Sequence, residues 1–511
     1  MLKIHTDKAE IKKGIDQAAN VIKSTLGAKG KTVLISSMHR PLRATKDGVS
    51  VAREITLSDE LQNLGAKIVR QASEETLDAV GDGTTTAALL VQSIATEALT
   101  RIDAGADPIL IKEGLDKTLP GVLEEIEKQK QEIKSKEEIE FVASISANDP
   151  EIGKILADIF HKIGKQGVVS IQDSPSFVNE WETVVGMRVD KGYASPYFIT
   201  DPEKRTCVLE DASVIILEGR PDLRTLTPAL DELLKSGKRT FLFVAEDYED
   251  SFLANLLINR ARGVFNAVAV KAPGFGEKRK GYLEDIAVLT GAKLSAETGR
   301  SEFAPEDTGN AKKVVVSKDH TDIIGGAGDE KEVEKRVKWL EFEKKQTSSE
   351  YERADLQSRI GKLTGGVAIF KVGGTTELEV KERKDRVEDA VAATRAALED
   401  GIVCGGGIAL LNAKKEMKVE GYGEILLNSL EAPFKTILKN AGKNPNEVQS
   451  QLSGRMGYNV KEGRIEEDMV TAGIIDPVKV VKIALINAVS AVGSFITSDY
   501  SIVEYKDEPN P

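Results

Sequence analysis

The residues best suited to chemistry are Gly81-Asp82-Gly83-Thr84-Thr85-Thr86. Apolar residues recur at helical spacing over 61–72 before this stretch and over 89–99 after it, which predicts a tight loop that opens a helix. The glycines let the backbone approach a ligand, and three hydroxyls beside the free N–H groups of a helix start suit an anion such as phosphate. Asp82 would repel that anion unless a cation such as Mg²⁺ lay between them. The alternative is an ordinary capped glycine turn.

Three further stretches have similar chemistry. Residues 25–30 and 401–407 are glycine-rich turns, and residues 45–48 end in Asp-Gly, which is also typical of a hairpin turn. None of them is the G-x-x-x-x-G-K-[ST] phosphate loop. Together with residues 81–86 they predict one nucleotide site assembled from four separate parts of the chain.

Composition bounds the class of protein. The 511 residues are enough for two to four domains, and the net charge of −12 disfavours binding to nucleic acid or to anionic membranes. Aromatic residues make up only 5% of the chain, which argues against base-stacking modules. Cys207 and Cys404 form no framework, which favours a reducing compartment. We find no signal peptide and no apolar run long enough to span a bilayer, so a cytosolic location is expected. The four histidines are scattered and are expected to be structural or on the surface: His5, His39, His161 and His320.

The elements that must position these residues fall into two classes. The outer thirds of the chain are helical in pattern, with helices expected over 6–27, most of 58–128, 385–400 and much of 408–496. A hairpin is expected between the first two of these helical stretches, with strands over 32–35 and 45–51.

The middle of the chain has a different pattern. Apolar runs at 214–217, 241–244 and 267–270 alternate with amphipathic stretches, which predicts an inserted α/β domain. Its last part, residues 329–363, predicts a charged antiparallel helix pair with an apolar stripe.

Taken together, these stretches resemble the GroEL-type group I chaperonins (the 60 kDa chaperonin family), and the resemblance extends along essentially the whole chain. Six stretches carry the resemblance: Thr25-Leu26-Gly27, residues 45–54, residues 81–86, residues 192–198 around Ser195-Pro196-Tyr197-Phe198, Lys271-Ala272-Pro273-Gly274-Phe275-Gly276, and Arg386-Val387-Glu388-Asp389-Ala390.

The resemblance implies an α+β multidomain chaperonin fold. Its parts would be a mainly helical, discontinuous equatorial domain (1–128 and 400–511), a small intermediate domain (129–185 and 367–399) and an inserted α/β apical domain (186–366). Glycines near the crossings suit hinges, because they tolerate large changes of φ and ψ.

The resemblance also implies an ATPase site with ATP, Mg²⁺ and K⁺. Asp82 would hold Mg²⁺, the Thr25 and Lys46 carbonyls would lie near K⁺, and Asp47 and Asp389 would position the attacking water as catalytic residues. The implied ATP contacts are Thr25, Leu26, Gly27, Ala28, Lys46, Gly81, Asp82, Gly83, Thr84, Thr85, Thr86, Gly406, Asn459, Val460, Ile474 and Asp476.

The remaining implications concern partners. Non-native client proteins and a GroES-type co-chaperonin would bind an apolar groove, and the subunits would form a homo-oligomeric ring, of seven by resemblance. The implied client-binding residues are Tyr193, Tyr197, Phe198, Leu230, Leu253, Leu257 and Ile258. For Leu230 and Leu253 a core position is an equal alternative, because helix stripes usually pack inward.

The chain departs from the family pattern in places. Ala28 stands where proline is usual, Thr227 where leucine is expected, and Lys461 where a small residue is usual. The chain ends at residues 507–511 without a Gly/Met-rich tail.

Two other functions compete with an ATP-dependent folding chaperone. A small-molecule kinase would use the same phosphate loops, but it would need a general base and a substrate pocket that residues 186–366 do not indicate. An ATP-independent holdase or scaffold would have a decayed site, which the presence of Asp47, Asp82 and Asp389 disfavours.

Overall fold

The structure is a computed structural model that describes residues 2–37, 40–165, 167–174, 176–202, 204–294, 303–347 and 349–504. The chain forms two compact units. The helical unit comprises the residues up to Asp158, then Asp173–Asn179, and those from Val372 on. The sheet unit comprises Ile159–Gln172 and Glu180–Lys371. The sheet unit is therefore an insertion in the chain, and the division into three domains stays a prediction.

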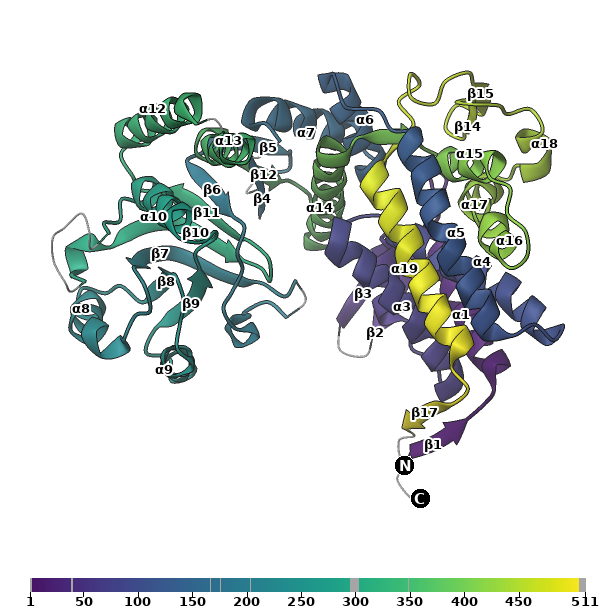
Figure 1. Ribbon diagram of the computed structural model, residues 1–511, viewed down its shortest axis with the longest axis horizontal. Coiled ribbons are helices and arrows are strands. Elements are labelled where there is room, and N and C mark those ends of the chain that lie inside the picture. The colour runs from purple at the N-terminus through teal and green to yellow at the C-terminus, as the bar shows by residue number, and fades with distance from the viewer. Residues whose placement is uncertain are drawn as a thin grey trace. The chain divides into compact units, whose positions relative to one another are not determined.

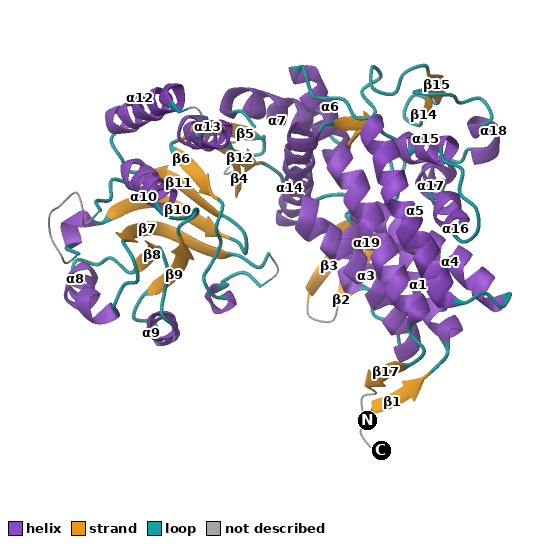
Figure 2. Ribbon diagram, viewed as in Figure 1, coloured by secondary structure: helices purple, strands orange, loops and turns teal. Residues whose placement is uncertain are grey.

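Long helices make up most of the helical unit (Figure 2). In chain order its helices are α1 (Lys8–Ile22), η1 (Lys23–Thr25), α2 (Gly48–Glu54), α3 (Glu60–Val80), α4 (Thr84–Asp103), α5 (Pro108–Lys128), α6 (Lys136–Ala147), α14 (Glu377–Asp400), α15 (Ile408–Glu416), α16 (Gly423–Ser429), α17 (Ala432–Asn440), α18 (Pro445–Gln449) and α19 (Val478–Thr497). Helix α7 (Pro150–Ile163) carries the chain into the sheet unit.

Short antiparallel strand pairs complete the helical unit. They are β1 (Leu2–His5) with β17 (Ser501–Glu504), β2 (Val33–Ser37) with β3 (Arg40–Thr45), β13 (Ile402–Cys404) with β16 (Ile475–Pro477), and β14 (Gly457–Asn459) with β15 (Arg464–Glu466).

Helix α19 corrects one sequence prediction. Its twenty residues are long and apolar enough to cross a membrane by length and composition, so the statement that no such run exists was wrong. The helix packs against α3, α4 and α5 (Figure 1), and residues along its length, from Val478 to Ile496, are buried in the core they share. Its apolar character is therefore explained by its position in the middle of the helix layer.

The predicted second hairpin strand was also placed wrongly. The strand ends at Thr45, and residues 48–54 form α2 instead of continuing it. The Asp47 carboxylate accepts hydrogen bonds from the N–H groups of Val49 (3.2 Å) and Ser50 (2.9 Å), so it is the N-cap of α2. The Asp47-Gly48 pair, which is also compatible with a hairpin turn, thus starts a helix.

The sheet unit is built on a six-stranded sheet in the order β6-β11-β10-β7-β8-β9. Strands β7 (Cys207–Leu217), β8 (Thr240–Ala245) and β9 (Asn266–Lys271) pair in parallel, and their alternation with helices agrees with the predicted α/β domain. Strands β6 (Gly186–Val189), β10 (Gly309–Val316) and β11 (Thr321–Gly326) extend the sheet with antiparallel pairings. A second sheet has the order β4-β12-β5, from β4 (Val168–Asp173), β12 (Val367–Val372) and β5 (Glu180–Val184).

The helices of this unit pack around the large sheet. They are η2 (Pro196–Phe198), α8 (Leu223–Lys235), α9 (Asp250–Ala261), α10 (Glu277–Thr290), η3 (Pro305–Asp307), α12 (Glu330–Gln346) and α13 (Glu350–Gly365). The predicted helix pair over 329–363 is confirmed as α12 and α13, and Leu340 and Ile360 on its stripe are buried.

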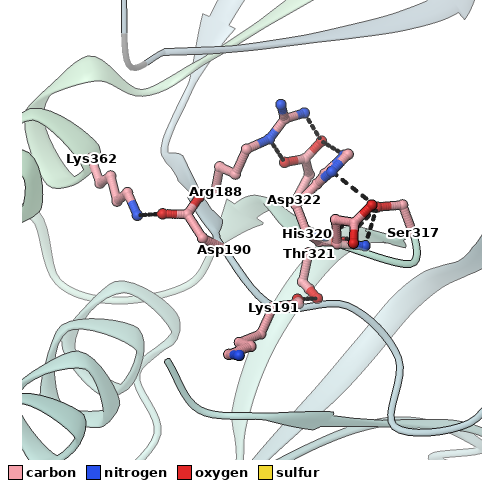
Figure 3. A network of polar contacts seen from close by, with 9 residues as sticks. Arg188, Asp190, Lys191, Ser317, His320, Thr321, Asp322 and Lys362 are labelled. Carbon is pink, nitrogen blue, oxygen red and sulfur yellow. Dashed lines mark hydrogen bonds and ion pairs between the residues drawn. The ribbon is translucent and has the colours of Figure 1, made fainter. Parts of the chain in front are cut away.

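A polar network at one end of the sheet unit contains Ser317, His320 and Asp322 (Figure 3). Ser317 Oγ lies 2.9 Å from His320 Nδ1, but His320 Nε2 is 3.9 Å from Asp322 Oδ2, which is too long for a hydrogen bond. Both Asp322 oxygens accept hydrogen bonds from Arg188, at 2.6 and 2.7 Å. The network therefore ties the β10–β11 turn to β6 and does not form a hydrolytic triad. His320 is structural, as predicted.

Candidate nucleotide site

A cavity of about 470 Å³ in the helical unit brings the four predicted stretches together. This volume is typical of a small-molecule site. Of the residues predicted for ATP and catalysis, every one but Gly81 lines the cavity: Thr25, Leu26, Gly27, Ala28, Lys46, Asp47, Asp82, Gly83, Thr84, Thr85, Thr86, Asp389, Gly406, Asn459, Val460, Ile474 and Asp476. Gly81 is the left-handed residue that ends α3, next to the lining.

The start of α4 supplies the anion-binding features of the cavity. Gly83 precedes the helix with φ of +83°, a conformation that favours glycine, and a Cβ at this position would lie 2.6 Å from Val480 Cγ1. The first N–H groups of α4 have no partner within the helix, and Thr84, Thr85 and Thr86 line the same cavity. The predicted helix-opening loop is therefore confirmed.

Gly48 allows α2 to approach α4 closely. A Cβ on Gly48 would lie 2.2 Å from Thr85 Oγ1 and 3.1 Å from Thr84 Oγ1. Because no side chain fits there, the capped start of α2 and the start of α4 can face the same small volume. Two helix N-termini together favour negative charge in that volume.

The turn after η1 is held in place by α17. Asn440 Nδ2 donates to the carbonyls of Lys23 and Leu26, each at 2.9 Å. Thr25 and Lys46, whose carbonyls were predicted to lie near K⁺, both line the cavity.

Asp82 is fixed by two hydrogen bonds. Its Oδ1 accepts from the Gly83 N–H at 2.5 Å, and its Oδ2 accepts from Ser146 Oγ of α6 at 2.8 Å. Burial raises the pKa of Asp82 above its ordinary value, the two hydrogen bonds oppose that rise, and the charge of Asp47 adds to it. A buried carboxylate of this kind is stabilised in its charged form by a nearby cation.

Asp389 lies on α14 and faces the same cavity as Asp47 and Asp82. Burial raises its pKa well above the ordinary value, and the charges of Asp47 and Asp82 raise it further. Carboxyl groups with raised pKa values that face one cavity, as Asp82 and Asp389 do, are typical of a functional site.

Gly406 and Asp476 line another part of the cavity. Asp476 lies on β16, opposite Val403 of β13, so the strand pair fixes its position. Burial, followed by the charge of Asp82, raises the pKa of Asp476 to about 7.

Asn459 is placed as predicted, but its side chain is already engaged. Its Oδ1 accepts from the N–H groups of Lys461 and Glu462, and its Nδ2 donates to Glu466 Oε1 at 3.1 Å. The amide therefore shapes the β14–β15 turn, and a ligand would meet the backbone here.

Sequence reasoning missed several lining residues. Ser146 and Phe141 come from α6, and Tyr458 precedes Asn459. Glu382, Asp385 and Arg386 stand seven, four and three residues before Asp389 on α14, and all three line the cavity. That spacing puts them on one helix face with Asp389, which is a signal the sequence did contain.

The predicted client-binding residues lie in the sheet unit and divide into three groups by burial. Phe198 is fully buried and Leu230 is 5% exposed, so both belong to the core, and the prediction that they form a binding surface needs correction. Phe198 packs inward because η2 turns the side chain after Tyr197 toward the sheet, and Leu230 lies on the inward stripe of α8. Tyr197 is 81% exposed and Ile258 is 48% exposed. Tyr193, Leu253 and Leu257 are partly buried against the core.

Comparison with known proteins gives consistent matches. The model of the TCP-1/cpn60 chaperonin family matches residues 18–223 and 220–506. The crystal structure of the chaperonin gp146 from the bacteriophage EL 2 (Pseudomonas aeruginosa), determined in the presence of ATP-BeFx, matches in two crystal forms. Crystal form II has a TM-score of 0.73 at 20% identity and covers 99% of this chain and 100% of that chain. Crystal form I has a TM-score of 0.65 at 21% identity and covers 99% of each chain. At this identity the structural likeness bears on the fold, which is that of a chaperonin.

Proposed function

Because this chain belongs to the TCP-1/cpn60 chaperonin family, we propose that it is an ATP-driven folding chaperone that hydrolyses ATP in the cavity of its helical unit. The family match, which extends over most of the chain, supports a chaperonin that assists protein folding. The observation that carries the ATP-dependent part is the convergence on one cavity of four separate stretches, two helix starts and the three aspartates predicted for Mg²⁺ and water, Asp47, Asp82 and Asp389.

The phosphates of ATP would lie against the starts of α4 and α2. Backbone N–H groups and the hydroxyls of Thr84, Thr85 and Thr86 are the donors available there. The close contacts at Gly48 support this placement indirectly, because a glycine there lets the start of α2 lie against the Thr84 and Thr85 hydroxyls at the start of α4. Gly406 and Asp476 would then face the ribose.

Asp82 fits a Mg²⁺ ligand by its chemistry. Mg²⁺ in proteins is typically bound through one or two carboxylates plus phosphate oxygens and waters, and Asp82 is a partly buried carboxylate beside the proposed phosphate position. The metal would neutralise phosphate charge during phosphoryl transfer. The carbonyls of Thr25 and Lys46 remain the proposed K⁺ ligands.

Asp389 and Asp47 would orient the attacking water. Asp47 spends both carboxylate oxygens on the α2 cap, at 3.2 and 2.9 Å. Asp389 faces the cavity with a raised pKa, which suits a group that accepts a proton from water. We therefore assign the principal role to Asp389 and a supporting role to Asp47.

Client proteins would bind the exposed apolar strip on α9 and the neighbouring η2 turn. Ile258 of α9 is 48% exposed, and Leu253 and Leu257 are partly exposed at the edge of the helix face that buries Phe252 and Leu256. Arg260 donates to the carbonyls of Tyr197 and Ile199, at 3.4 and 3.3 Å, so the exposed Tyr197 lies beside this strip. An exposed apolar patch of this kind is typical of a binding surface.

Three aspects of the assembly follow from the family and are proposed on that basis. The subunits would form a ring, with seven as the number expected, and a GroES-type co-chaperonin would close it. The cytoplasmic location stays a prediction.

The test is refolding of a chemically denatured client protein by the purified oligomer. We expect recovery of the client's activity with Mg²⁺ and ATP, and little recovery with ADP or with EDTA present. Aggregation suppressed equally with and without ATP would instead identify a holdase. ATP turnover that is independent of clients and transfers phosphate to a small molecule would identify a kinase.

A further inference from the structure

One side of α12 carries aromatic residues that the rest of the sheet unit does not cover. Trp339 is 46% exposed and Phe342 is 57% exposed, three residues apart on the helix. The opposite side of α12 packs on the unit through Leu340, which is fully buried, and Val337. A surface helix normally presents polar residues on the side away from its core, so exposed aromatics there indicate a binding surface.

A row of lysines runs along the same side of α12. The row consists of Lys331, Lys335, Lys338 and Lys345, all of them exposed. Their spacing of four, three and seven residues places them on one helix face, in line with Phe342. Lys335 pairs with Glu332 at 2.6 Å, whereas the other three make no ion pair within the described residues. The lysine row is thus a line of positive charge beside exposed glutamates, on a chain whose net charge is −12.

Trp339 is held in position before any partner binds. The Arg336 guanidinium carbon lies 4.6 Å from the centre of the Trp339 ring. Arg336 is itself fixed by Asp285 and Glu284 of α10, each at 2.8 Å. A ring that is already oriented loses less conformational entropy on binding, so it makes a better anchor.

We propose that this face of α12, the Trp339–Phe342 surface, binds an acidic peptide segment of another protein that presents an aliphatic or aromatic side chain. The two aromatics offer the apolar area that anchors such contacts, and the unpaired lysines give charge complementarity. This surface does not depend on the proposed client site, because α12 packs on α10 and α13 while α9 packs on β9, well away from it (Figure 1).

Other occupants match this face less well. A second copy docked symmetrically would bring the lysine row against itself, which like charges oppose. An anionic membrane would also meet a parallel row of exposed glutamates on the same helix: Glu330, Glu334 and Glu341. A narrow peptide can follow the lysine row and avoid those glutamates, whereas a flat membrane cannot.

The test uses a short synthetic peptide rich in aspartate and glutamate, with two leucines one helical turn apart. Two matched peptides replace either the acidic residues by lysine or the leucines by serine. The chain has two tryptophans, so Trp181→Phe leaves Trp339 as the reporter of its own surface. We expect saturable quenching or shift of Trp339 emission by the acidic leucine peptide, weakened by salt, and no response to the two matched peptides.

Variants of the full-length oligomer locate the binding. With a fluorescein-labelled peptide, W339S/F342S should weaken binding at least about tenfold. The single variant Phe342→Ser removes less apolar surface, so it should weaken binding less and serves as a check if the double variant does not fold. K338Q/K345Q should weaken it about two- to fivefold and reduce its dependence on salt. The control K235Q/K318Q changes the same charge at two exposed lysines elsewhere in the sheet unit and should have no effect.

Several results would overturn the proposal. They are equal binding of the lysine peptide, unchanged binding in W339S/F342S, or loss of peptide binding in Tyr197→Glu, which would assign the peptide to the client surface. Self-association that W339S/F342S abolishes would make a second copy the occupant. Binding to phosphatidylserine vesicles without binding to the peptide would make a membrane the occupant of this surface.

Discussion

Replacing Asp476 by asparagine should stabilise the ligand-free protein at neutral and alkaline pH while weakening its binding of ATP. Burial and the charge of Asp82 raise the pKa of Asp476 to about 7 from 3.8. The folded state therefore holds a proton that the unfolded state releases between about pH 4 and pH 7. Stability falls as the pH rises through that window, and asparagine, which does not titrate, escapes the loss.

The magnitude follows from the two pKa values. A difference of 3.8 to about 7 corresponds to roughly 4 kcal/mol above pH 7, since a tenfold change in proton affinity is worth about 1.4 kcal/mol. Asp476 is not fully enclosed, and water screens part of the effect, so we expect about 2–4 kcal/mol at pH 8. Near pH 4, where Asp476 is protonated in the folded state and partly protonated in the unfolded state, the gain should fall below about 1 kcal/mol.

The assay is urea unfolding of the variant and the parent at several pH values between about 4 and 8. The control is Asp231→Asn, an exposed aspartate on α8, for which a change within about 0.5 kcal/mol is expected. The same variant should bind ATP about tenfold more weakly or worse if Asp476 accepts a hydrogen bond from the ribose. A gain that does not vary with pH, or a loss of stability at pH 8, would refute the assignment of Asp476 as a strained carboxyl group.

Three further predictions concern the nucleotide cavity and the proposed client surface. Asp82→Ala should retain the fold and lose most Mg²⁺-dependent ATP affinity in calorimetry, and unchanged affinity would remove Asp82 as the metal ligand. Gly48→Ala should lower ATP affinity because its Cβ would meet Thr85 Oγ1 at 2.2 Å. Adding Thr85→Ser keeps the hydroxyl oxygen and should not restore ATP affinity. Adding Thr85→Ala removes that oxygen, so it should relieve the clash and recover about 1–3 kcal/mol of stability. Tyr197→Glu should abolish binding of unfolded protein with ATPase activity and assembly intact, whereas Phe198→Ala should cost about 3–5 kcal/mol of stability because Phe198 is in the core. Unfolding of the Tyr197 variant would place that residue in the core as well.

Much of the fold could be predicted because local pattern and tertiary role agree. The parallel strands β7, β8 and β9 coincide with the apolar runs at 214–217, 241–244 and 267–270. The stretch 81–86 was placed correctly because glycine conformation and helix capping are local properties.

The errors have physical causes that a single sequence hides. Asp47-Gly48 is compatible with a hairpin turn and with a helix start, and only the packing of α2 against α4 decides between them. Phe198 and Tyr197 are adjacent aromatics, yet one is buried and the other exposed, because the η2 turn sends them in different directions. The contact of Ser146 with Asp82 joins residues 64 apart in the sequence, and no local pattern indicates it.

The central claim, that this chain couples hydrolysis of ATP to its work as a chaperone, is tested most directly by single-turnover hydrolysis in the parent and in Asp389→Ala. We expect the parent to hydrolyse bound ATP and the variant to bind ATP with near-normal affinity. Hydrolysis in the variant should be slower by roughly a hundredfold or more, because it has lost a positioned acid–base group. Hydrolysis at the parent rate in Asp389→Ala, or a parent protein that binds ATP without hydrolysing it, would contradict the account.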